Sequence, residues 1–452
     1  MNYRMLLTIC TLFFVLPSDL VSAQTKKPNL IIVLCDDLGW GDVGYHGTNK
    51  VTKTPNLDAM AKASVRFNSF HSTTSICSPT RGSVLTGRSP TRYGIYGTRY
   101  PLPRSEVTIA DVLRMFGYRS GHFGKWHLGG LRANQITSPA NQGFDTWFSI
   151  LNSYQVPRID TKGFVRDGAT VPQLKGFVDD VVFDEALKFI RANAGKKQPF
   201  FAHICTLSPH GIPNEAPDRL RKYFPGLSED QQHVWGMIAA IDENVGRLRE
   251  ELRKLGIEDD TIVLFTSDNG QSRFNPYSGG KGTIREGGLR VPCLIEWPGR
   301  IRTPFQTEMP AYTCDILPTF LEIAGGTLPK DALPLDGISL LPVLDGKVKE
   351  RPNPIVFHYE DGADKNKSKL GQNGFAVLEG NWRYVTTLDD KQSALYDLAK
   401  DPGEKTDIAA THPEVVARLK DARDRWWVSV RADPHYRTFE QAQKLRDKTD
   451  VD

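Results

Sequence analysis

LIIVLCDD, residues 30–37, is the stretch of this 452-residue chain that decides the fold. Six consecutive apolar residues are typical of a strand that is buried on both faces of a parallel sheet. The run ends in two aspartates, Asp36 and Asp37. Two further apolar runs end in polar residues in the same way: residues 200–207, close to His210, and residues 261–266, before Asp268 and Asn269. Because ligands bind at the carboxyl edge of open α/β sheets, these strand ends predict a ligand site there.

Helical patterns alternate with these strands. Thr54 and Pro55 begin one helix, and a second has an apolar stripe that stops at Gly117. A longer one begins at Ser228, where Gln231 completes a capping box, and ends at Gly256. The pattern predicts an α/β fold with a large central, mixed but mostly parallel sheet that is flanked by helices.

The last quarter of the chain has a different pattern. Gly, Pro, Asp and Lys cluster at residues 325–350, and short strand-like segments follow at residues 354–359, 374–378 and 382–386. A helical pattern covers residues 413–430. We therefore expect a main domain over residues 24–340 and a smaller C-terminal subdomain over residues 341–452, built from an antiparallel sheet and a helix.

The first 23 residues read as a secretory signal. Arg4 provides the positive start, residues 6–16 an apolar run, and Val21-Ser22-Ala23 a small-residue cleavage site. The run is too short to span a bilayer, so we expect an exported protein, periplasmic or extracellular, without stable membrane insertion. A net charge of +4 is small for this length and argues against a nucleic-acid partner.

CSPTRGSVLTGR, residues 77–88, predicts a site for an anion. Ser78 can cap a helix whose first residue is Pro79, which places Cys77 at the positive end of that helix. Arg81 adds a full positive charge one turn later. Removal of the signal leaves an odd number of cysteines, five, which in an exported protein marks one thiol as special. Cys77 is the cysteine in a polar and cationic setting.

A cation site is predicted beside it. Asp36, Asp37, Asp268 and Asn269 offer only hard oxygen ligands, which suit one Ca²⁺ or Mg²⁺ better than zinc. Adjacent strand residues point to opposite faces, so Asp36 and Asp37 can share a metal only where the strand breaks. The nearby Gly39 permits such a break.

Four more residues could serve the cleavage of an ester of a tetrahedral anion. They are cationic or titratable and lie in or beside glycine-rich segments or after a strand: Lys125 and His127 in the glycine-flanked loop GKWHLGG, His210 in SPHGIP, and Lys281 in GGKGTIREGGLRVP. Fixed positive charges stabilise the oxygens of such an anion, and a proton donor serves the leaving alcohol.

Together these motifs resemble those of the type I, formylglycine-dependent sulfatases of the alkaline-phosphatase-like superfamily. The matching segments are PNLIIVLCDDLGWGD (28–42), CSPTRGSVLTGR (77–88), GKWHLG (124–129), the His210 segment, SDNG (267–270), GGKGTIREGGLRVP (279–292) and ALYDLAKDPGEKTDIA (394–409). The resemblance spans nearly the whole mature length. It implies an exported bacterial enzyme that removes sulfate from an organic ester, with a carbohydrate sulfate expected as its substrate.

The resemblance also implies a role for each residue. A formylglycine-generating or anaerobic sulfatase-maturing enzyme would convert Cys77 to formylglycine, whose hydrated form is the nucleophile and carries a covalent sulfo-enzyme intermediate. Arg81, Lys125 and His127 would contact this group, with His127 as the base that regenerates the aldehyde. His210 and Lys281 would bind the sulfate, and one of them would protonate the leaving group. Asp36, Asp37, Asp268 and Asn269 would hold the cation, usually calcium.

Two other functions stay open at the level of sequence. A phosphomonoester or phosphonate hydrolase of the same superfamily also binds a tetrahedral anion with similar ligands. An inactive protein that binds sulfated glycans would result if Cys77 were never oxidised. For the outer pocket, the sequence suggests three segments rich in aromatic or basic side chains, residues 98–104, 141–158 and 358–369. Their candidate contacts to a sugar are Arg99, Arg104, Trp147, Tyr154 and Arg158.

Overall fold

The computed structural model describes residues 26–132, 134–271, 273, 276–328, 332–361 and 369–447. The expected signal segment, residues 1–23, and residues 362–368 of the last expected pocket segment lie outside the described residues. No helix in the described ranges combines the length and apolar character needed to cross a bilayer.

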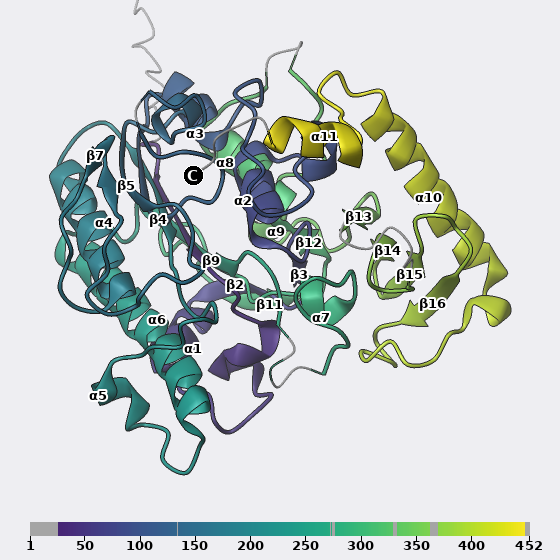
Figure 1. Cartoon of the computed structure of the whole chain (residues 1–452), viewed down its shortest axis with the longest axis horizontal. Coiled ribbons are helices and arrows are strands. Elements are labelled where there is room, and N and C mark those ends of the chain that lie inside the picture. Colours follow the sequence, from purple (N-terminus) through teal and green to yellow (C-terminus); the bar gives the residue numbers. More distant parts are fainter. Residues whose placement is uncertain are drawn as a thin grey trace, which may run out of the picture.

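A ten-stranded mixed sheet forms the centre of the molecule (Figure 1). Its strands, in spatial order, are β11 (Phe305–Thr307), β2 (Ser64–Phe67), β10 (Leu294–Glu296), β9 (Thr261–Ser267), β1 (Asn29–Cys35), β8 (Phe200–Cys205), β4 (Arg119–Lys125), β5 (Thr146–Ile150), β6 (Val165–Arg166) and β7 (Ala169–Thr170). The five strands from β9 to β5 are all parallel, and the antiparallel pairs lie outside them. The predicted mixed, mostly parallel sheet is therefore confirmed.

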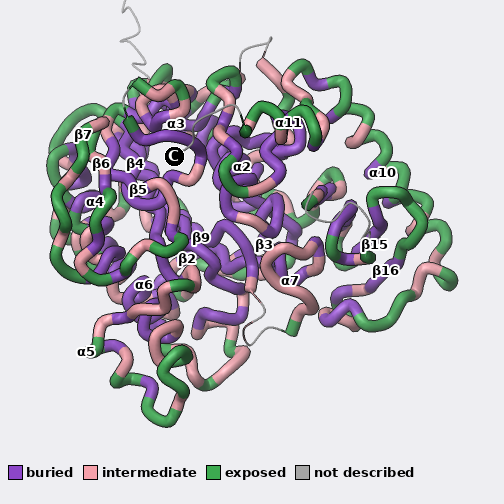
Figure 2. Tube along the Cα trace, in the orientation of Figure 1, coloured by how far each residue is buried: buried purple, intermediate pink, exposed green. Residues whose placement is uncertain are grey.

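Helices cover both faces of this sheet because successive residues of β1 point in opposite directions. Ile31 and Val33 pack against the helices α1 (Pro55–Ala61), α4 (Val178–Ala194) and α6 (Glu229–Lys254). Leu30 and Ile32 pack on the other face, against α2 (Cys77–Thr86), α3 (Ile109–Met115) and α8 (Ile316–Ile323). Figure 2 shows the resulting buried layer, which runs through the central strands and α2.

The helix limits follow the sequence closely. The hydroxyl of Ser228 accepts a hydrogen bond from the Gln231 amide at the start of α6, and Gly256 follows its end with a φ of 64°. The helix α3 has an equivalent capping box at its start, and Gly117 follows it with a φ of 84°. The predicted start and end of α6 and the predicted end of α3 are confirmed. The short helix α5 (Asp218–Arg221) precedes α6, and the short helix α7 (Glu286–Leu289) follows the Lys281 segment.

The C-terminal part forms a separate four-stranded antiparallel sheet with a helix beside it (Figure 1). Its elements are β13 (Ile355–Tyr359), β14 (Gly374–Glu379), β15 (Trp382–Thr386), β16 (Ser393–Asp397) and α10 (Pro413–Arg431). This agrees with the predicted antiparallel sheet and helix. Residues of the flanking helices α9 (Leu341–Leu344) and α11 (Phe439–Arg446) pack in the core of the large sheet.

One small parallel pair of the main part packs against the C-terminal sheet. The strand β3 (Phe70–His71) pairs with β12 (Ala311–Tyr312) just before the segment that carries Cys77. Tyr312 packs in the same apolar cluster as Phe357 of β13. The C-terminal sheet therefore lies against the elements that lead into the candidate site.

Candidate active site

The carboxyl ends of β1 and β9 bring four oxygen-bearing side chains together. These strands are parallel neighbours, with Cys35 opposite Ser267, so the residues that follow them meet at one edge. Asp37 has a φ of 65°, so the chain leaves its extended path directly after Asp36. The Asp37 amide donates to Asp268 Oδ1 at 3.1 Å, and Asn269 Nδ2 donates to Asp37 Oδ1 at 2.9 Å. All four side chains are buried.

Cys77 is the first residue of α2 and points at this cluster. Its Sγ lies 3.5 Å from Asp36 Oδ1 and 3.6 Å from Asn269 Oδ1. Burial is the main cause that raises the pKa of the thiol, and Asp268 adds to it against the opposing charge of Lys125 and Lys281. The thiol is therefore neutral near pH 7, unlike the activated thiolate of a cysteine nucleophile.

The predicted helix start is wrong by two residues. The helix begins at Cys77 after Ile76, whereas Ser78 was expected to be its cap. The hydroxyl of Ser78 has no hydrogen-bond partner among the described residues, so it does not cap the helix. Pro79 is nevertheless tolerated, because amides in the first turn of a helix have no partner within the helix. The free amides of this turn therefore start at the candidate nucleophile itself.

The cations Arg81 and Lys125 each bind one carboxylate of the cluster. Arg81 donates from Nε and Nη2 to Asp268 Oδ2, at 3.0 and 2.7 Å. The ammonium of Lys125 lies 2.8 Å from both carboxylate oxygens of Asp36. Burial raises the pKa of Asp36, but Lys125, followed by other cations, lowers it well below its usual range. Burial raises the pKa of Asp268 above its usual value, against the opposing charge of Arg81. Lys125 is the last residue of β4, not the loop residue that the sequence suggested.

His127 follows the same strand with a φ of 57° and is partly buried. Burial, and next the charges of Lys125 and Arg81, lower the pKa of its imidazole well below the ordinary value. Its Nδ1 has no hydrogen-bond partner among the described residues. A neutral imidazole with an unpaired nitrogen is chemically able to accept a proton.

His210 and Lys281 close the site from two further segments. His210 Nδ1 donates to the carbonyl of Gly211 at 2.8 Å, and Nε2 lies 3.8 Å from Asp37 Oδ2. Lys281 Nζ lies 2.6 and 2.8 Å from the Asp37 oxygens and 3.4 Å from Cys77 Sγ. Burial lowers the pKa of Lys281, but the charges of Cys77 and Asp37 raise it by more. The net pKa lies above the ordinary value, so the ammonium stays charged. All ten residues named from the sequence therefore lie in or beside one cluster.

Two supporting residues, Ser153 and Arg273, had no signal in the sequence, and the role of a third, Arg158, was predicted wrongly. The hydroxyl of Ser153 donates to Asp36 Oδ2, and Arg273 donates to the carbonyl of Asp37 at 2.7 Å. Arg158 was expected to face a sugar, but its side chain is fully buried and donates to the carbonyls of Val156, Ser153 and His210.

Other residues expected in the outer pocket differ in exposure. Trp147 is buried, while Arg99, Arg104 and Tyr154 are exposed. The five cysteines of the described residues, Cys35, Cys77, Cys205, Cys293 and Cys314, are all free and buried. Cys35, Cys205 and Cys293 pack in the apolar clusters on the two faces of the large sheet, as small hydrophobic residues do.

The cluster fits a hard divalent cation. Three carboxylates and the amide oxygen of Asn269 match the ligands that Ca²⁺ and Mg²⁺ prefer. Asp36, Asp37, Cys77 and His210 offer potential ligand atoms within 4.8 Å of one another. Three negative charges so close together require cations, which Arg81, Lys125 and Lys281 supply in part.

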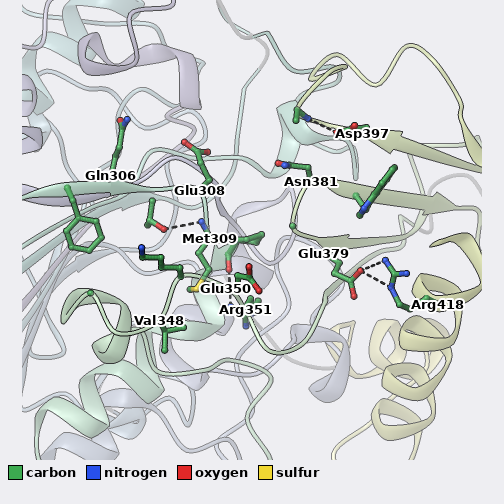
Figure 3. A pocket seen from close by; sticks show the side chains of 18 residues that line it. Gln306, Glu308, Met309, Val348, Glu350, Arg351, Glu379, Asn381, Asp397 and Arg418 are labelled. Atoms are coloured by element: carbon green, nitrogen blue, oxygen red, sulfur yellow. Dashed lines mark hydrogen bonds and ion pairs between the residues drawn. The ribbon is translucent and has the colours of Figure 1, made fainter. Parts of the chain in front are cut away.

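A separate groove of 1090 Å³ lies between β11 and the β14–β15 hairpin, where Glu379 pairs with Arg418 (Figure 3). None of the ten candidate residues lines it. Its lining is of mixed charge, with Glu308, Glu350, Glu379 and Asp397 beside Lys349 and Arg418. The groove is therefore distinct from the cluster around Cys77.

Comparison with known proteins assigns the family. A model of the sulfatase family matches residues 28–326, and one described as "N-sulphoglucosamine sulphohydrolase, C-terminal" matches residues 280–425. Human N-acetylgalactosamine-6-sulfatase is 31% identical over 88% of this chain and 85% of its own length. Human arylsulfatase A is 32% identical over 88% of this chain and 87% of its own length. The crystal structure of Ps i-CgsB in complex with k-i-k-neocarrahexaose superposes with a TM-score of 0.81 at 26% identity, covering 93% of this chain and 98% of that one. The chain belongs to the sulfatase family, and its enzymatic activity is that of a sulfatase.

Proposed function

We propose that this sulfatase removes sulfate from carbohydrate sulfate esters and that Cys77, converted to formylglycine, is its nucleophilic residue. The observation that carries the proposal is the position of Cys77 Sγ, between Asp36, Asn269 and Lys281 at the start of α2. Hydrated formylglycine supplies one hydroxyl to attack sulfur and a second whose deprotonation expels sulfate. The buried, neutral thiol is a poor nucleophile by comparison.

In this proposal the cations around Cys77 bind and orient the sulfate group. The ammonium of Lys281 is close enough to Cys77 to contact an oxygen on the reacting sulfur. The Nε2 of His210 lies beside Asp37, and the imidazolium form of this ring can donate the Nε2 proton to the leaving alcohol. Arg81 and Lys125 hold Asp268 and Asp36 in place and add positive charge where the transition state gains negative charge. His127, neutral at pH 7, is the base that accepts a proton from the second hydroxyl.

Asp36, Asp37, Asp268 and Asn269 are proposed to hold one divalent cation, Ca²⁺ in first place and Mg²⁺ in second. Their oxygen-only donor set and their burial support this assignment. When bound, the cation supplies positive charge that polarises a sulfate oxygen and favours the ionised nucleophile. Asn269 Nδ2 donates to the Asp37 carboxylate and Arg273 to the Asp37 carbonyl, so both help to fix the position of this residue.

A carbohydrate substrate is proposed from the relatives. One similar structure holds a neocarrahexaose, and one similar enzyme is named for N-acetylgalactosamine 6-sulfate. The exposed Arg99, Arg104 and Tyr154 remain proposed contacts to such a sugar. Export through the signal of residues 1–23, action in the periplasm or outside the cell, maturation by a formylglycine-generating or anaerobic maturing enzyme, and the division at residue 340 belong to the same proposal.

The proposal is tested with protein produced beside a maturing enzyme. Mass spectrometry of the Cys77 peptide should find the aldehyde or its hydrate, and Cys77→Ala should abolish sulfate release from an aryl sulfate. Cys293→Ala, at another buried cysteine, is the matched control and should retain activity. Activity with an unmodified thiol would refute the formylglycine mechanism, and faster turnover of an aryl phosphate would favour the phosphatase alternative. A panel of sulfated mono- and oligosaccharides then tests the substrate. Turnover of the aryl sulfate without any sugar would refute the carbohydrate assignment.

A further inference from the structure

The motif at residues 394–409 reaches from the C-terminal subdomain to the loop that carries Lys281. Its Glu404 is only 4% exposed. The Oε2 atom of Glu404 accepts a hydrogen bond from the Ser278 hydroxyl at 2.6 Å and another from the Glu286 amide at 3.0 Å. Ser278 and Glu286 stand before and after Lys281, so one carboxylate ties together both ends of the loop.

Arg383, on β15, makes a second connection to the same loop. Its guanidinium is fully buried, with Nη1 2.8 Å from Glu286 Oε1, and Nη2 donates to the Ile284 carbonyl. Glu286 also lies 3.0 Å from His71 Nε2 and 3.1 Å from Arg290 Nη1, both of the main domain. The carboxylate of Glu286 is therefore shared between the two parts of the protein.

The opposite side of the loop is fixed to the segment of the nucleophile. The Gly282 amide donates to the carbonyl of Ser75 at 3.0 Å, two residues before Cys77. The Ile284 amide donates to Gly371 of the C-terminal part at 3.1 Å. Lys281 thus extends toward Asp37 and Cys77 from a loop that is held on both sides.

The contact between the C-terminal part and the Lys281 loop is made by buried charged groups, and holding the two parts together does not by itself explain this choice. Removing ions from water is costly, and a well-packed apolar contact would hold the two parts together equally well. A carboxylate that accepts two directed hydrogen bonds, in contrast, fixes the position of the backbone that donates them. The ammonium of Lys281 must lie close to the reacting group, where a displacement of about 1 Å is already costly to catalysis.

We propose that Glu404 and Arg383 are positioning residues, which act from the C-terminal subdomain to hold the Lys281 ammonium against the nucleophile. The proposal rests on the role proposed for Lys281 above. It gives the motif at residues 394–409 a part in catalysis without contact to the substrate.

A double-mutant cycle with Lys281→Ala tests the proposal in the matured enzyme. Glu404→Ala should lower kcat/KM for an aryl sulfate by up to about 100-fold. Glu404→Gln keeps an acceptor oxygen and should lose less. In the Lys281→Ala background, Glu404→Ala should cost less than about twofold, because the side chain that it positions is gone. An equal loss in both backgrounds would mean that Glu404 acts only on overall structure and would overturn the proposal.

The control is Glu379→Ala, on β14 of the sheet that also carries Arg383. Glu379 also binds an arginine, Arg418, but at the groove of Figure 3, so kcat/KM should not change. Arg383→Lys keeps the positive charge, so its kcat/KM should lie between that of the wild type and that of Arg383→Met. If Glu404→Ala does not fold, the double-mutant cycle with Lys281→Ala is carried out with Glu404→Gln, Arg383→Lys and Arg383→Met instead.

Hydrogen exchange separates this proposal from the role of Lys281 itself. Amide exchange at residues 280–286 should accelerate in Glu404→Ala, while exchange in β1 should not. Unchanged exchange in the loop would overturn the positioning role. Full activity of Lys281→Ala, with faster loop exchange in Glu404→Ala, would instead refute the catalytic role of Lys281 and leave Glu404 as a structural clasp.

Discussion

The ammonium of Lys125 lies 2.8 Å from both carboxylate oxygens of Asp36, and neither side chain is exposed to solvent. Lys125 ends β4, and Asp36 follows β1 with β8 between these strands. The pair therefore spans the carboxyl edge of the sheet beneath Cys77. It shows how the site depends on charges that the fold has removed from water.

Replacement of Lys125 by methionine should destabilise the metal-free protein strongly. The change leaves the Asp36 carboxylate buried without its main partner, and loss of one member of a buried pair costs about 3–5 kcal/mol. Urea unfolding in the presence of a chelator measures the difference. Lys175→Met is the control, because Lys175 pairs with Asp160 at the exposed surface and its loss should not be measurable. Equal stability of Lys125→Met and wild type would contradict the prediction.

Chelation should lower both the activity and the melting temperature of the enzyme. A cation that binds only the folded cluster stabilises it by about 2.7 kcal/mol when its free concentration is 100 times its Kd. Calcium added to chelated protein should restore both quantities, and Mg²⁺ tests the second choice of ion. Asp268→Asn removes one of the three negative charges and should weaken the restoration. An unchanged melting temperature in excess chelator, with wild-type activity, would exclude the cation site.

Several of these features could be predicted from the sequence because they depend on local patterns. The apolar runs of β1 and β9 mark buried strands, and the polar residues at their ends lie at the sheet edge for topological reasons. Ser228 and Gln231 define the start of α6 through hydrogen bonds within four residues of chain. The apolar runs and the capping box are each contained in one short segment, and the position of the strand ends follows from the topology of a parallel sheet.

The strand β4 gave no such signal. Its sequence, RSGHFGK, has two glycines and four polar or charged residues, so Lys125 was predicted to lie in a loop. Its partners explain the strand. A Cβ on Gly124 would lie 1.8 Å from the carbonyl oxygen of Cys205, so glycine is required for β8 to approach. This requirement exists only once β4 and β8 are paired.

The role of Arg158 was missed for a similar reason. The partners of Arg158 are backbone carbonyls. Because every residue has one, the sequence contains no residue type that would indicate the contact. A basic residue near an aromatic segment reads as a surface contact for an anionic sugar. Burial, which decides otherwise, is a property of the tertiary structure.

The buried imidazole of His358 should make the protein less stable in acid. Burial lowers its pKa to about 3, and the ring bonds to Thr91 Oγ1 at 3.0 Å. The unfolded side chain has a pKa of about 6.5, so below that pH the unfolded state binds a proton that the folded state rejects. Stability is therefore complete above about pH 6.5 and falls toward about pH 3, by up to about 1.4 kcal/mol per pH unit.

The measurement is the free energy of unfolding in urea at a series of pH values from about 7 down to about 4. His358→Phe lacks the titrating group, so its stability should depend less steeply on pH, whatever its value at neutral pH. Parallel curves for the variant and the wild type would show that His358 does not contribute to the acid sensitivity.

Replacement of Arg158 by methionine should impair catalysis although the side chain does not reach the substrate space. Its Nη2 atom donates to the carbonyls of Ser153, whose hydroxyl binds Asp36, and of His210, the proposed proton donor. Loss of this link frees both segments, and displacement of catalytic groups by about 1 Å can cost up to about 100-fold in rate. Because proton donation by His210 is affected, the loss should appear mainly in kcat and should shrink for aryl sulfates with acidic leaving groups, which need no proton. Arg104→Met, at an exposed arginine, is the control for the fold, although it should raise KM for a sulfated sugar if Arg104 contacts it. A loss that is independent of the leaving group would contradict the link through His210.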